Sequence, residues 1–179
     1  MTHTISQHSL EKLQHGTVDF VVHFGTNELP SEIIAVPLGN LKFVLAARID
    51  HPFKGTKAKV EELVCSPFAH IDLAYFDKSK KSRIEEEALL RGTSLKMSLR
   101  TTSVVGLIDT VKQSNVLAPC MVPVIEQHRH DIRAITVEGL GGIDDIEVFA
   151  YIHKRNQHSA KYKWLLDLIE VAMFEKYHE

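Results

Sequence analysis

The stretch that decides the fold class is IIAVPLGNLKFVLAARIDHP, residues 33–52. Its two apolar runs, residues 33–38 and 41–47, predict two strands. The second run is long enough to cross between two lobes of a protein. The segment Asp50-His51-Pro52 predicts a turn directly after it.

Strands and helices alternate on both sides of this stretch. The segments expected before it are a strand at residues 4–6, a helix at 9–15 that stops at Gly16, and a buried strand at 18–24. The segments expected next after it are a helix at 59–64, a strand at 68–76, a helix that a Ser82–Glu85 capping box opens and Gly92 ends, and a strand at 95–100.

The last third of the chain continues the alternation. Thr101-Thr102-Ser103 opens a helix to about residue 112, and a short strand at 116–118 is ended by Pro119. Strands are expected at 132–138 and 146–153, followed by a helix capped by Ser159. We expect a buried stripe on this helix, formed by Trp164, Leu165, Leu168, Ile169 and Ala172. The whole order implies an α/β fold with largely parallel sheets.

Composition excludes several classes of protein. The 179 residues are 44% hydrophobic and carry a formal net charge of −2, which argues against a chain that binds nucleic acid throughout. The polar N-terminus is unlike a secretory signal and no apolar run reaches the length of a membrane span, so a cytoplasmic location is expected. Cys65 and Cys120 stand alone in apolar surroundings and are expected to be buried.

Motifs for catalysis and for metal or cofactor binding are missing from the sequence. It contains no GxSxG, P-loop, HExxH or dinucleotide-binding glycine pattern, so we expect neither an enzyme nor a cofactor. The segment His128-Arg129-His130-Asp131 could hold a metal only if further ligands converged on it. We interpret it as a solvated loop and expect no metal.

Five segments form an ordered set along the chain: Leu10-x-x-Leu13-x-x-Gly16-x-Val18-Asp19, Val36-Pro37-Leu38 with Asp50-His51-Pro52, the helix at residues 60–63, the helix–turn–strand at 103–119, and the strand at 147–155 with the helix after it. In this order and spacing they resemble the effector-binding domain of LysR-type transcriptional regulators. The Asp-His-Pro turn is the most specific of them, and the resemblance covers essentially the whole chain.

The resemblance implies a fold, an organisation and partners. The fold would be the two-lobed type 2 periplasmic-binding-protein-like α/β fold, with residues 1–47 and 144–179 in lobe I and 48–143 in lobe II. Residues 1–6 would align with the second strand of such a domain. The resemblance thus implies an N-terminally truncated domain without its first strand and helix, in a chain that contains no DNA-binding helix-turn-helix. Regulators of this family pair as homodimers and reach DNA through that separate domain.

Four loops would face an effector bound in the cleft between the lobes. They supply the candidate site residues Ser6, Gln7, His8, His23, Phe24, Tyr75, Phe76, Thr102 and Ser103. Hydroxyls and free amides at helix starts suit an anion, so the expected effector is a small organic acid, with an aromatic acid as one form of it. Each residue also has a structural interpretation: serine and threonine at helix starts are more often caps, one of Tyr75 and Phe76 would be core, and His23 is equally well a structural histidine.

Two other interpretations share the same fold. One is a solute-binding protein for transport, against which the Asp-His-Pro turn argues. The other is a truncated fragment that binds no ligand and serves only in dimerisation.

Overall fold

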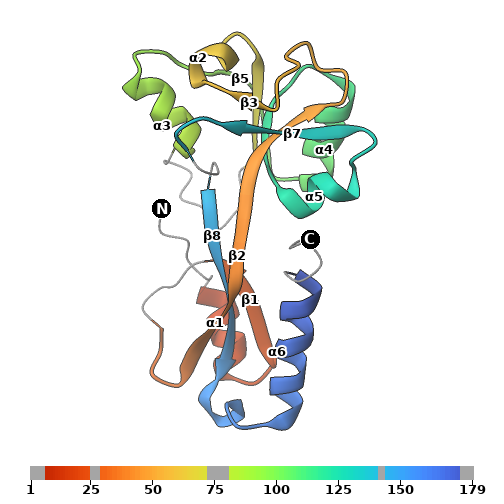
Figure 1. Ribbon diagram of the computed structural model, residues 1–179. Helices are drawn as coiled ribbons and strands as arrows, with labels where there is room; N and C mark the ends of the chain where they lie inside the picture. The colour runs from red at the N-terminus through yellow and green to blue at the C-terminus, as the bar shows by residue number, and fades with distance from the viewer. Residues whose placement is uncertain (1–6, 25–28, 72–80, 141–143, 174–179) are drawn as a thin grey trace. The chain divides into compact units, whose positions relative to one another are not determined.

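The computed structural model describes residues 7–24, 29–71, 81–140 and 144–173, and the statements that follow concern these residues (Figure 1). The chain forms two compact units. Unit 1 comprises Met1–Leu41 and Ile146–Glu179, and unit 2 comprises Lys42–Asp145. Each unit is described by itself.

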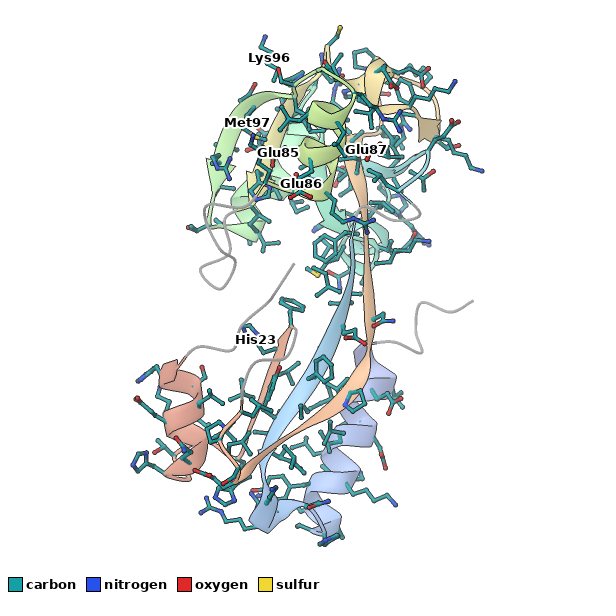
Figure 2. All side chains as sticks on the ribbon, turned by 90° about the vertical axis from the view of Figure 1, so that its left-hand side faces the viewer. His23, Glu85, Glu86, Glu87, Lys96 and Met97 are labelled. Atoms are coloured by element: carbon teal, nitrogen blue, oxygen red, sulfur yellow. The ribbon has the colours of Figure 1, made fainter. Side chains whose placement is uncertain are left out.

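Unit 1 is a layered arrangement of three strands and two main helices. Its strands follow the order β1-β8-β2, and its two helices α1 and α6 lie on opposite sides of them (Figure 2). The elements are α1 (Gln7–Gln14), β1 (Phe20–Phe24), the first part of β2 (Ile33–Arg48), most of β8 (Asp144–His153), the short 3-10 helix η1 (Lys154–Asn156) and α6 (Ala160–Met173).

The helix α1 packs on the sheet as its apolar spacing predicts. Leu10 and Leu13, three residues apart on one face, are buried together with Ile33 of β2 and Tyr151 of β8. Gly16 follows the helix with a φ of +70°, a conformation that glycine adopts without strain. The helix and its glycine stop are therefore confirmed, with a start two residues earlier than expected.

Two burial predictions in unit 1 are wrong. The strand β1 is half-buried at every residue, because among the described strands it pairs only with β8. On α6, Trp164 is 64% exposed and Leu168 48% exposed, and Ala172 is also exposed. The buried residue is Tyr162, whose hydroxyl donates to the Asp19 carboxylate at 2.5 Å. Leu165 and Ile169 are half-buried.

Unit 2 is built around the second part of β2. This part of β2 pairs antiparallel with β6 (Ala118–Met121) and with β7 (Ile132–Val137). The strand β3 (Lys57–Ala58) adds to β7 in parallel, and β4 (Pro67–Ile71) pairs in parallel with β5 (Lys96–Thr101). Its helices are α2 (Val60–Leu63), α3 (Arg83–Leu90), α4 (Val104–Gln113) and α5 (Val122–Gln127).

The core of unit 2 lies under α4. Leu107, Ile108 and Val111 form the buried face of this helix and pack with Val44 of β2 and Ile132 of β7. The sequence predicts an apolar stripe of Val104 with these three residues, at i, i+3, i+4 and i+7; Val104, in the first turn, is 37% exposed instead. The capping box of α3 is confirmed in its glutamate half, since the Ser82 amide donates to the Glu85 carboxylate at 2.8 Å.

Pairing in the main sheet departs from the expected parallel arrangement. The two apolar runs of residues 33–47 form one continuous strand, β2, and its described partners β6 and β7 run antiparallel to it. Because β6 and β7 both run antiparallel to β2, they run parallel to each other, and α5 connects them as a crossover. Among the described strands, parallel pairing is confirmed for β3 with β7 and for β4 with β5, and an isolated parallel bridge joins Phe68 to Leu117.

Two local predictions in unit 2 also fail. Pro119 lies inside β6 instead of ending a strand before it, which a strand of only four residues tolerates. Cys65 is exposed because it falls in the turn after α2, whereas Cys120 is buried as expected.

Candidate functional site

Candidate residues of unit 1 gather at one end of it. The chain turns back between α1 and β1, which contact each other, so the start of the helix and the end of the strand lie at the same end. Gln7 and His8 occupy the first turn of α1, and His23 and Phe24 are the last residues of β1. His8 is exposed and Figure 2 shows His23 at this end of the unit.

His23 is held as a neutral imidazole. Its Nδ1–H donates to the carbonyl of Phe24 at 2.8 Å, and the two rings lie 5.9 Å apart at an angle of 53°. Burial lowers the pKa of His23, a shift that the hydrogen bond to Phe24 partly opposes. At neutral pH the ring is therefore uncharged, and it presents an aromatic face together with Phe24.

Candidate residues of unit 2 form the start of α4. The Ser103 hydroxyl accepts from the Gly106 amide at 3.1 Å and so caps the helix, while the Ser103 amide donates to the Thr101 hydroxyl at 3.0 Å. Thr102 is exposed. The first-turn amides of a helix have no acceptor within the helix. Those of Val104 and Val105 therefore remain available to a carboxylate, assisted by the helix dipole.

The remaining candidates are not placed by the structure. Ser6, Tyr75 and Phe76 lie outside the described residues. The residues that are described fall into two groups, His8 with His23 and Phe24 in unit 1, and Thr102 with Ser103 in unit 2. Each group is brought together within its own unit.

The most specific sequence motif turns out to be structural. His51 is 2% exposed; its Nε2–H donates to the carbonyl of Asn115 at 3.1 Å, and its Nδ1 accepts from the Phe53 amide at 3.1 Å. Burial is the main cause that lowers the pKa of His51, and the charges of Arg133 and Arg48 add to it. Arg133 also donates to the carbonyls of Phe53 and Gly55, which fixes the loop after the turn.

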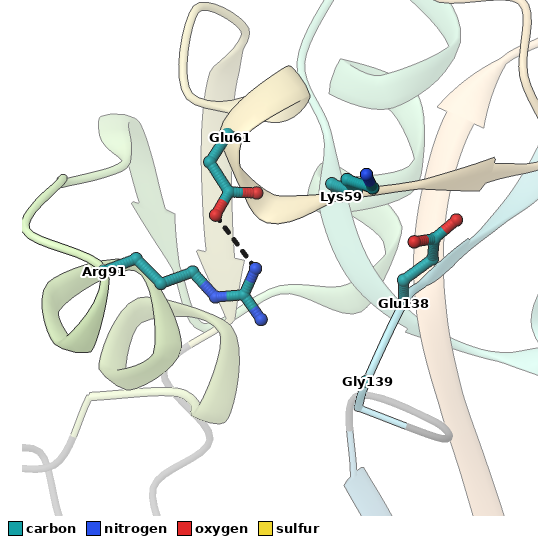
Figure 3. Close-up of a pocket in the computed structure, with 5 residues that line it drawn as sticks. All are labelled: Lys59, Glu61, Arg91, Glu138 and Gly139. Atoms are coloured by element: carbon teal, nitrogen blue, oxygen red, sulfur yellow. Dashed lines mark hydrogen bonds and ion pairs between the residues drawn. The ribbon is translucent and has the colours of Figure 1, made fainter.

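A pocket in unit 2 was not expected from the sequence. It has a volume of about 590 Å³ and is lined by Lys59, Glu61, Arg91, Glu138 and Gly139 (Figure 3). Arg91 Nη1 contacts Glu61 Oε1 at 2.9 Å. These residues come from α2, α3 and the turn after β7, so no spacing along the chain could have grouped them. Only Gly139 carried a signal, as part of a glycine-rich turn.

The described part of the chain holds neither a cluster of metal ligands nor a membrane-spanning helix. There, no three His, Cys, Asp or Glu side chains converge as a metal site would require, and His130 is exposed. None of the described helices has both the length and the apolar character needed to span a lipid bilayer.

Comparison with protein families decides the affiliation. The family model named LysR substrate binding domain matches residues 1–173. The chain belongs to this family. LysR-type proteins are transcriptional regulators, a class that is not enzymatic. No curated protein is similar enough in sequence to count as a relative.

Solved structures show the same fold at low identity. The regulatory domain of the transcriptional activator MexT from Pseudomonas aeruginosa has a TM-score of 0.70 at 15% identity, over 90% of this chain and 77% of that one. HinK, a LysR family transcriptional regulator from the same organism, has a TM-score of 0.69 at 14% identity, over 94% of this chain and 57% of HinK. The LysR-type chain thus has the two-lobed, periplasmic-binding-protein-like α/β fold of these domains.

The LysR-type chain is shorter than some of these neighbours. PA0477, described as a probable transcriptional regulator from Pseudomonas aeruginosa, has a TM-score of 0.66 at 18% identity over 88% of the present chain. That match spans 51% of PA0477, so the chain covers about half the length of this neighbour.

Proposed function

We propose that this chain is the effector-sensing domain of a LysR-type transcriptional regulator. The observation that carries the proposal is the match of the LysR substrate binding domain model to residues 1–173. The neighbours named above, which include the regulatory domain of an activator and a LysR family regulator, support it. Family membership also favours a sensor over a solute-binding protein for transport.

The ligand in this proposal is a small organic acid bound between the two lobes. Its carboxylate would bind at the start of α4, where Thr102 and Ser103 offer hydroxyls and the next two residues offer free amides. An aromatic acid would also stack against His23 and Phe24, whose rings lie together at the end of β1. His8, Gln7, Ser6, Tyr75 and Phe76 complete the proposed set.

The proposal extends to organisation and partners. We infer lobes at residues 1–47 with 144–179 and at 48–143, a homodimer in the cytoplasm, and contact with DNA through a helix-turn-helix domain outside these residues. Effector binding would act by favouring one arrangement of the dimer over another.

A thermal-shift screen tests the proposal. The panel contains benzoate, salicylate, succinate and pyruvate, with benzamide as the aromatic control that lacks a carboxylate. At about 100 times its Kd, a ligand of the folded chain should raise Tm by roughly 5 °C or more. The Thr102→Val variant removes one hydroxyl at an exposed position and should reduce the shift, and Thr93→Val serves as its matched control.

The outcomes separate the rival functions. A shift with benzoate but not with benzamide, reduced in Thr102→Val and kept in Thr93→Val, supports the sensor. No shift with any acid of the panel would favour the fragment that only dimerises.

A further inference from the structure

The pocket of unit 2 has a wall of charges of both signs. It lies between the start of α2, the end of α3 and the turn after β7 (Figure 3). Its lining carries two cations, Lys59 and Arg91, and two carboxylates, Glu61 and Glu138. None of these residues belongs to the set proposed for the organic-acid effector.

Arg91 is a fixed part of this wall. Its Nη1 donates to Glu61 at 2.9 Å, and its Nε donates to Glu87, one turn earlier on α3, at 2.9 Å. Nη2 contacts the same Glu87 carboxylate at 2.8 Å. These two carboxylates raise the pKa of Arg91, and Arg91 in turn lowers the pKa of Glu61. Three of the five guanidinium N–H groups, one on each nitrogen, are thus committed to α2 and α3, and the side chain stays 34% exposed. The guanidinium is therefore oriented before any ligand arrives.

Lys59 and Glu138 are the charges left for a ligand. Among the residues that the structure describes, neither the Lys59 ammonium nor the Glu138 carboxylate has a hydrogen-bond or ion-pair partner, although the Lys59 backbone amide donates to Glu62. Both side chains are exposed, and Figure 3 shows them across the pocket from Arg91.

Gly139 keeps the space beside the guanidinium open. It has a φ of +83°, and a Cβ built on it would lie 3.9 Å from Arg91 Nη2. A larger side chain at this position would stand against the Nη2 edge of the guanidinium, in a backbone conformation that such residues rarely adopt. As a glycine, residue 139 places no side chain against Nη2.

We propose that this pocket binds a small zwitterion with an ammonium and a carboxylate on one carbon, as in a free α-amino acid. Lys59 and the two N–H groups of Arg91 not engaged by Glu61 and Glu87 would hold the carboxylate, and Glu138 would hold the ammonium. In this lining a simple anion would be attracted by two cations and repelled by two carboxylates. A simple cation would likewise be attracted by two groups and repelled by two. A zwitterion matches both signs at once.

NMR titration of the 15N-labelled chain with L-glutamine tests the proposal. Two analogues of the same skeleton serve as comparisons: glutaramate, which lacks the ammonium, and 4-aminobutanamide, which lacks the carboxylate. Glutamine should cause saturable shifts of the amides of Lys59, Glu138 and Gly139. Because the charged groups are exposed, binding should weaken with added salt. Each analogue should bind about threefold to fivefold more weakly than glutamine.

Two substitutions test the named contacts. Lys59→Met keeps the aliphatic stem and Glu138→Gln keeps the shape, and each should weaken glutamine binding about threefold to fivefold. Lys163→Met and Glu126→Gln, at exposed positions on α6 and α5, should bind as the unaltered chain does. Because all four positions are exposed, the spectra should retain the dispersion of a folded protein.

Three results would overturn the inference: no saturable shift at these amides, glutaramate binding as tightly as glutamine, or unchanged binding in both pocket variants. The first means that the pocket is empty in solution, and the second means an anion site. A chain that shows no thermal shift with any acid of the panel can still bind glutamine here, so the two proposals fail independently.

Discussion

His51 shows how a specific sequence motif can serve the fold instead of the ligand. The side chain is buried, and both ring nitrogens are used within unit 2, one toward Asn115 and one toward Phe53. Nδ1 accepts a hydrogen bond, so a proton on it would meet the Phe53 N–H instead of an acceptor. The turn therefore depends on the neutral form of the ring.

This dependence predicts a loss of stability in mild acid. The pKa of His51 is lowered in the folded chain, so below the ordinary value of about 6.5 the unfolded state binds more protons than the folded state. The contribution is fully present above about pH 6.5 and is lost as the pH falls toward the lowered pKa. Urea unfolding of the chain should therefore give a smaller free energy at pH 5.5 than at pH 7.5.

A pair of variants assigns this effect. His51→Asn should unfold more easily at pH 7.5 and should lose part of the difference between the two pH values. His130→Asn, at an exposed position, should keep the full difference. Equal pH dependence in the unaltered chain and in His51→Asn would show that another group is responsible.

At the scale of single elements, local chemistry was predictable and tertiary burial was not. The spacing of Leu10 and Leu13 and the capping box of Ser82 and Glu85 depend on neighbours in sequence, and both hold in the structure. On α6 the buried residue is Tyr162, and its hydroxyl donates to Asp19, which is 143 residues away. No window of sequence contains that contact.

The same hydrogen bond, which ties α6 to the residue before β1, predicts a contribution to stability. Tyr162→Phe removes the hydroxyl that donates to Asp19 at 2.5 Å and should cost about 1–2 kcal/mol of unfolding free energy. Lys161→Met removes a 3.8 Å ion pair to the same carboxylate, in which both side chains are largely exposed, and should have little effect. Urea unfolding curves measure both, and equal effects of the two substitutions would contradict the assignment of the anchor to Tyr162.

At the scale of the whole molecule, the family was evident from the order of motifs, whereas the candidate sites were only partly so. Ser103 could be placed at a helix start because capping is local chemistry. The charged pocket could not be predicted, because Lys59, Arg91 and Glu138 meet only after three elements have folded together. The parallel sheet was wrongly expected because alternation of strands and helices does not show that β6 and β7 both run antiparallel to β2.

Hydrogen exchange at the start of α4 tests the sensor function most directly. Mass spectrometry would compare peptides that cover residues 101–107 and 20–24, with and without the acid of the panel that gives the largest Tm increase. If the carboxylate binds the free amides of Val104 and Val105, exchange in 101–107 should slow, and the strand end at His23 and Phe24 should be protected with it. Unchanged exchange in both peptides at saturating acid would contradict the proposed effector site.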